Sequence, residues 1–309
     1  PNIVIIDSPT SHIIQSVDSI KIIFDGNTTQ LASLTVGNII LCGIASNAPY
    51  GFMRKITAIQ KVGTVSIFTT VEISLEEAFK ELNVDYTKLF TTADTALRVT
   101  DTKFTFDSTT ILYDEDGNKR TIDDQIKVKE KIEIAPNFRF AVKISNFKLQ
   151  SAIVQGDFQT IYDQTLTVGS ARFSVFDTLD FYKKLLTPFA VPGLPFLIVV
   201  PTLRVSLITQ AELNGGLTAS QQITSNVKTS IEYKNNNWDK NYNQTLSTTH
   251  TTPNISGNAS IKVAVQPAID FKIYNSEWAK GSVWVEGYLQ AKGSLLPNPS
   301  CELKAGIGC

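Results

Sequence analysis

The 309-residue sequence has little cysteine, histidine or charge, and each shortage excludes classes of protein. Its three cysteines are too few for a disulfide framework, and no Cys-x-x-Cys or Cys/His cluster suits structural zinc. With 28 basic and 29 acidic residues, the chain has almost no net charge and no positive electrostatic field to attract nucleic acid, so we expect no nucleic-acid partner. The longest apolar run, residues 189–200, is interrupted by Pro192, Gly193 and Pro195, so we expect no transmembrane segment.

Motifs that would carry catalysis are also scarce. The two histidines, His12 and His250, stand in no Ser-His-Asp or Cys-His pattern, and neither a Gly-x-Ser-x-Gly nor a Walker motif occurs. We therefore expect a protein that is not an enzyme. A secreted glycosidase is the alternative, because acidic pairs occur along the chain and their separation in space is invisible in a sequence.

What the sequence does contain is alternation. From Leu217 to Tyr233 every apolar residue stands at an odd position, and so do the large apolar residues from Ile261 to Ile273. A period of two indicates strands with one buried and one solvated face. At about 3.3 Å per residue, the first run would extend roughly 55 Å. Such lengths predict a large antiparallel sheet or roll.

We predict a mainly β fold in two parts: a small β domain over residues 1–95, then a large antiparallel β domain over residues 96–309. In the first part, Ser74 and Glu77 have capping-box spacing and predict one helix over residues 74–83. A second helix is predicted over residues 175–186, where apolar residues recur at helical spacing before Pro188.

Turn chemistry divides the large domain into strands. Asn-Gly-Gly at residues 214–216 and Lys-Asn-Asn-Asn at residues 234–237 predict two hairpin turns. Residues 243–258 are polar and rich in threonine. They predict either a mobile loop or an edge ribbon that is wet on both faces.

The acidic segment at residues 114–124 is the most specific local signal for a cofactor. Its oxygen-bearing residues alternate around Gly117 in a spacing that suits a hard cation such as calcium. The candidate ligands are Asp114, Asp116, Asn118, Asp123 and Asp124. Gly117 comes two positions earlier than in an EF-hand loop, and Gln125 replaces the expected glutamate. An ordinary acidic turn explains the same residues, so the expected cofactor is either none or calcium.

Aromatic residues gather in the last third of the chain. Trp238, Trp278 and Tyr242 stand in or beside polar segments, where aromatic rings of β proteins stack on sugars. Packing in the core is the alternative for the same rings.

Two kinds of covalent modification are predicted. Asn-x-Ser/Thr sequons occur at four positions, Asn27, Asn243, Asn254 and Asn258. Cys301 and Cys309 are close enough in sequence to form a disulfide in an oxidising compartment, whereas Cys42 lies in an apolar run typical of a buried thiol.

Several short segments carry a family resemblance. They are residues 34–40, 49–56, 70–79, 193–201, 231–238 and 273–274. Together they resemble an uncharacterised family of large, secreted, β-rich bacterial surface proteins. The resemblance implies an extracellular or surface setting and supplies no catalytic residue. One departure is Asn38, where the family usually has aspartate.

These observations predict an extracellular or cell-surface protein with a structural or adhesive role. We expect a self-associating module of a filament or of a large adhesin, whose partners are copies of itself, other surface proteins or glycans. The alternative is a glycan-binding, lectin-like module that uses Trp238, Trp278 and Tyr242. The chain starts without methionine, which indicates either a processed mature protein or a piece of a longer one, and its end within a patterned segment favours the piece.

Overall fold

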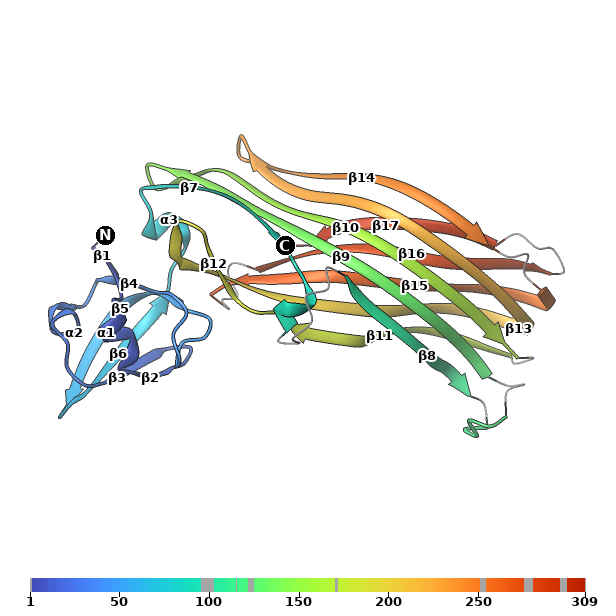
Figure 1. Cartoon of the computed structure of the whole chain (residues 1–309), viewed down its shortest axis with the longest axis horizontal. Coiled ribbons are helices and arrows are strands. Elements are labelled where there is room, and N and C mark those ends of the chain that lie inside the picture. Colours follow the sequence, from blue (N-terminus) through green and yellow to red (C-terminus); the bar gives the residue numbers. More distant parts are fainter. Residues whose placement is uncertain are drawn as a thin grey trace.

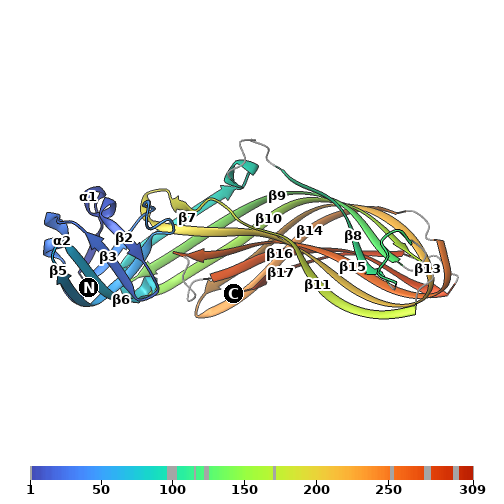
Figure 2. The same cartoon turned by 90° about the horizontal axis from the view of Figure 1, so that it is seen from below.

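The structure is a computed structural model, and it describes residues 2–95, 103–114, 116–121, 125–169, 172–250, 254–274, 280–294 and 299–308. The molecule is elongated, with a six-stranded sheet at one end and an eleven-stranded sheet along the rest (Figures 1 and 2). The fold is therefore mainly β, as predicted. In these ranges, no helix has both the length and the apolar character needed to cross a membrane.

The smaller sheet is built from residues 3–72. Its strands lie in the order β1 (Ile3–Ile5), β4 (Ile39–Cys42), β5 (Phe52–Val62), β6 (Val65–Glu72), β3 (Lys21–Asp25) and β2 (Ile14–Val17). The described helical segments are α1 (Ser8–His12), α2 (Thr29–Ser33), α3 (Leu75–Ala78) and a 3-10 turn (Thr92–Thr95). The N-terminal part thus has more than the one helix expected, and all of its helices are short.

The helix expected over residues 74–83 is much shorter than predicted. Ser74 caps α3 as expected, and its Oγ accepts a hydrogen bond from the backbone N–H of Glu77 at 3.2 Å. From Glu81 the chain instead forms strand β7 (Glu81–Leu89), because Leu82 and Val84 alternate with exposed residues and pack into the core of the larger sheet. The chain therefore enters the larger sheet at β7.

The larger sheet holds all the long strands. They are β7, β8 (Phe104–Asp114), β9 (Gln125–Ser145), β10 (Lys148–Val168), β11 (Arg172–Leu185), β12 (Phe189–Val191), β13 (Leu194–Lys234), β14 (Asn237–His250), β15 (Asn254–Ile273), β16 (Lys280–Ser294) and β17 (Pro299–Gly308). The main path runs β17-β16-β15-β13-β10-β9-β7, with β8 on β9 and with β11, β12 and β14 on β13. Apart from the small β12, strands that follow one another in sequence lie beside or in line with one another, as in an antiparallel meander.

Strand β13 is the centre of this sheet, with 41 residues. Strands β11 and β10 pair with residues 202–214 and 217–234 of it, while β15 and β14 pair with residues 199–218 and 221–234. From residue 202 of β13 onward, each of its edges is therefore covered by two strands in succession. The predicted sheet of long antiparallel strands is confirmed.

Two local predictions in this sheet are wrong. The helix expected over residues 175–186 is strand β11, which supplies hydrogen-bonding partners for one edge of β13. Asn214 makes no two-residue hairpin turn, because the backbone pairing of β13 continues through it, with Arg172 on one side and Asn258 on the other. The turn at residues 234–237 is confirmed, with φ of +54° at Asn235 and +61° at Asn236, as a type I′ hairpin requires.

Alternate residues of β13 face the core as predicted. Val227 and Ile231 are buried, whereas Asn226 and Lys228 are exposed. The core lies inside the sheet, which is rolled so that β10 approaches β16 face to face. A Cβ placed on Gly287 would lie 2.9 Å from the Tyr162 ring, so glycine permits this close approach.

Candidate functional site

Strand β14 is exposed along most of its length. Among the described strands it pairs with β13 alone, so its other edge carries no ladder of backbone hydrogen bonds. Every residue from Asn237 to Ser247 is exposed. Of the two alternatives for this polar region, the part from Asn243 to Ser247 forms an edge ribbon that is exposed on both faces. Such an edge is a template for a further strand.

An apolar stripe runs along one face of β14. Trp238 is 50% exposed, Tyr242 is 65% exposed and Leu246 is 40% exposed. These three lie opposite Tyr233, Thr229 and Ser225 of β13. Directly opposite residues share a face of the sheet, so the stripe continues the buried inner face out to an uncovered edge. We call Trp238, Tyr242 and Leu246 the edge stripe.

The edge stripe contains two of the three aromatic residues predicted to bind glycans. Trp238 packs against Tyr233 with ring centroids 5.0 Å apart, which holds the indole in place. Trp278 lies outside the described residues. The sequence reading missed Leu246, although its spacing of four residues from Tyr242 puts both on one face of a strand.

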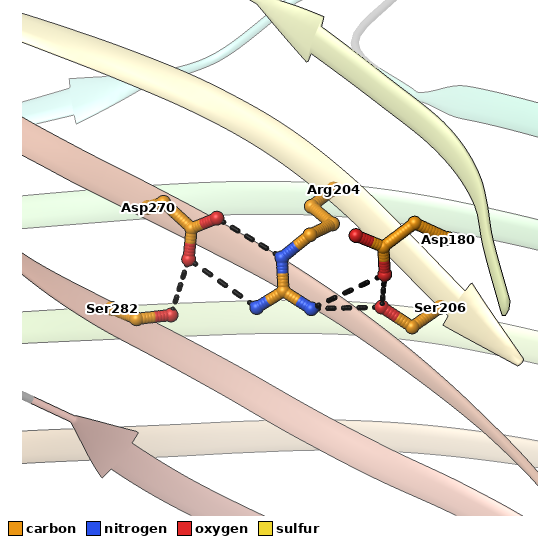
Figure 3. Close-up of polar contacts among 5 residues, drawn as sticks. All are labelled: Asp180, Arg204, Ser206, Asp270 and Ser282. Atoms are coloured by element: carbon orange, nitrogen blue, oxygen red, sulfur yellow. Dashed lines mark hydrogen bonds and ion pairs between the residues drawn. The ribbon is translucent and has the colours of Figure 1, made fainter. Parts of the chain in front are cut away.

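A polar cluster fastens four strands of the large sheet together (Figure 3). Arg204 Nε donates to Asp270 Oδ2 at 3.0 Å, and Arg204 Nη1 donates to Ser206 Oγ at 2.8 Å. Ser206 Oγ donates to Asp180 Oδ1 at 2.5 Å, and Ser282 Oγ donates to Asp270 Oδ1 at 2.6 Å. The bond to Asp270 raises the pKa of Arg204. Every oxygen acceptor named here already has a donor. The cluster is therefore best explained as a structural link between β11, β13, β15 and β16.

Glu130 is a buried acid inside the sheet. It is 1% exposed on the inner face of β9, and its Oε1 accepts a hydrogen bond from Gln164 Nε2 at 3.3 Å. Its Oε2 is buried and has no partner among the described residues. Burial raises the pKa of the Glu130 carboxyl to about 7, and the bond from Gln164 opposes this shift.

The acidic segment predicted to bind calcium forms a turn in its described part. Asp116 Oδ1 accepts from the backbone N–H of Asn118 at 2.7 Å, and Asn118 Oδ1 accepts from that of Arg120 at 3.2 Å. Gln125 Nε2 donates to Asp114 Oδ2 at 3.1 Å. Over the described residues, no group of three histidine, cysteine or acidic side chains is placed to hold a metal. Asp123 and Asp124 lie outside the described residues, so calcium stays a prediction.

The predicted modification sites are placed unevenly. Asn27 is exposed in the turn after β3, and Asn243 is exposed on β14. Asn254 and Asn258 lie in strand β15, and Cys301 lies in strand β17 opposite Leu289. Cys309 lies outside the described residues, so the disulfide stays a prediction.

The third cysteine has the predicted environment. Cys42 is a buried free thiol at the end of β4. Burial raises the pKa of this thiol to about 12, which leaves it protonated and poorly reactive at neutral pH.

Comparison of the chain with protein-family models, with curated proteins and with solved structures found no match. The resemblance to secreted bacterial surface proteins stays a prediction.

Proposed function

We propose that this chain is a structural or adhesive module of an extracellular surface, and that it self-associates through β14. The observation that carries the proposal is the edge stripe: three large apolar side chains on a strand whose outer edge pairs with none of the described strands. The long, continuous sheet behind that edge supplies a stiff support. The nearly balanced charge of the chain, 28 basic against 29 acidic residues, reduces repulsion between copies.

A second copy of β14 fits this edge in an antiparallel pairing. With a two-fold axis at Tyr242, the two Tyr242 rings meet, and Trp238 of each copy lies opposite Leu246 of the other. The same register places Lys240 opposite Gln244 and Asp239 opposite Thr245 of the second copy. No like charges face each other. All six apolar side chains of the two edge stripes lie on one face of the paired strands, with the Lys240–Gln244 pairs between them.

Sedimentation velocity over a range of protein concentrations tests the pairing. Tyr242→Lys places two ammonium groups against each other at the two-fold axis, so we expect this variant to stay monomeric where the natural protein dimerises. Ser247→Lys is the matched control, because it puts a lysine on the other face of β14, opposite Asn237 of the second copy. The proposal is wrong if the natural protein remains a monomer at high concentration, or if Tyr242→Lys associates equally well.

The alternative use of the edge stripe is glycan binding. Trp238 and Tyr242 are four residues apart on one face, which separates them by about 13 Å along the strand. A glycan-binding module predicts that Trp238→Ala abolishes binding to an immobilised glycan. In that case the natural protein would sediment as a monomer.

A further inference from the structure

A second feature lies on the other face of β14 and of the strands beside it. A groove of about 600 Å³ crosses β7, β9, β10, β13 and β14 on the outer side of the sheet, facing away from the core. Its volume is within the range of ligand sites, roughly 300–1,000 Å³. The edge stripe is on the other face of β14, so the two features do not overlap.

Cross-strand register arranges the groove in two parallel rows. The first row is Leu89, Asn137, Asp157, Lys228 and Asn243, each directly opposite the next. The second row, two residues along each strand, is Ala135, Gln159, Asn226 and Thr245. Neighbouring strands are about 4.8 Å apart, so the first row spans roughly 19 Å. The groove is therefore long enough for an extended ligand.

Four of the nine side chains in these rows are carboxamides, which both donate and accept hydrogen bonds. Asp157 and Lys228 lie directly opposite each other, so their charges cancel locally. Asn137 Oδ1 is buried and accepts no hydrogen bond from the described residues. A ligand hydroxyl in the groove would supply the missing donor.

We propose that this groove binds a neutral oligosaccharide. Vicinal hydroxyl groups match rows of amides that donate and accept, while the half-exposed Leu89 at one end offers an apolar surface to the C–H face of a sugar ring. A nucleic acid would require several basic side chains, and Lys228 is opposed by Asp157. The site goes beyond association through β14 and does not depend on it.

The groove is suited to binding without hydrolysis. Asp157 is the one carboxylate among the described residues that line it. Glycosidases commonly need two carboxyl groups that flank the scissile bond, one as acid and one as base or nucleophile. The oligosaccharide would therefore be held and released unchanged.

Affinity electrophoresis of the full chain, produced without N-glycosylation, tests the site. The gels contain a neutral glucan, a mannan or a xylan, with heparin as the anionic comparator. We expect retardation by at least one neutral polysaccharide, and titration with its hexasaccharide then measures the affinity. Asp157→Asn and Gln159→Ala should each weaken binding about tenfold or more, since each removes hydrogen bonds to hydroxyl groups.

Asp163→Asn is the matched control, because Asp163 is exposed on the same face of β10 but outside the groove. Its affinity should be unchanged. Tyr242→Lys should also bind normally, which separates a failure of this site from a failure of the β14 pairing. The proposal is overturned if heparin alone retards the protein, if nothing does, or if both groove variants bind as well as the natural protein.

Discussion

Replacing Glu130 with glutamine probes the interior of the large sheet. In the folded chain the pKa of this carboxyl is raised from its ordinary value of 4.5 to about 7 by burial. Between these two values the folded state holds a proton that the unfolded state has lost. Stability is then expected to fall as the pH rises, because the slope follows the difference in bound protons between unfolded and folded states.

The magnitude follows from the two pKa values. Each unit of pKa difference corresponds to about 1.4 kcal/mol, so the change from 4.5 to about 7 costs the folded state about 3 kcal/mol in full. Below about pH 4.5 the penalty is nearly absent, and above about pH 7 it is complete. Glutamine keeps an Oε1 acceptor for Gln164 Nε2 and carries no charge at any pH.

Urea unfolding at several pH values measures this effect. Glu130→Gln should match the natural protein near pH 4.5 and exceed its stability by up to about 3 kcal/mol near pH 8. Glu133→Gln is the control, because Glu133 lies on the outer face of the same strand and forms surface ion pairs with Lys103 and Lys131. We expect it to change stability by less than about 1 kcal/mol. A Glu130→Gln difference that does not grow with pH would refute the reasoning.

Three further predictions concern the sheet and its turn. Gly287→Ala should lower the free energy of unfolding by about 1–3 kcal/mol, because the new Cβ would collide with the Tyr162 ring; an unchanged urea midpoint would contradict the close approach of β10 and β16. Arg204→Met should cost about 1–2 kcal/mol, because Asp180 and Asp270 lose their shared cation in a partly exposed site; Arg204→Lys should recover only part of this, since lysine lacks the planar fork. If the Asp114 segment binds calcium, millimolar calcium should raise the Tm and a chelator should reverse it, whereas an unmoved Tm removes the metal.

Alternation and turn chemistry were enough to predict the architecture. In β13, the alternation of the sequence shows that Val227 and Ile231 face the core. The Asn235-Asn236 turn follows from the tolerance of asparagine for positive φ. Glu130 was also within reach of prediction. It lies two residues from both Val128 and Ile132, on the face of β9 whose other residues are apolar, and this position predicts a buried acid.

The failures have one physical cause, which is that strand pairing is not local. Phe176 and Leu179 fit a helical stripe, but the free edge of β13 needed hydrogen-bonding partners, and β11 supplies them. The edge stripe and the outer groove depend in the same way on register. Asn137, Asp157 and Lys228 are far apart in sequence, and only the pairing of β9, β10 and β13 brings them into one row.

The length of β13 has a consequence for how the protein is made. One edge of this strand is covered by segments synthesised before it, but the other waits for β14 and β15, which end at Ile273. At roughly 5–20 residues per second, the ribosome needs about 2–8 s to deliver them. During those seconds one edge of β13 lacks its partner strands and can pair with neighbouring nascent chains. A holdase chaperone, or a wider spacing of ribosomes along the messenger RNA, should therefore raise the yield of native protein.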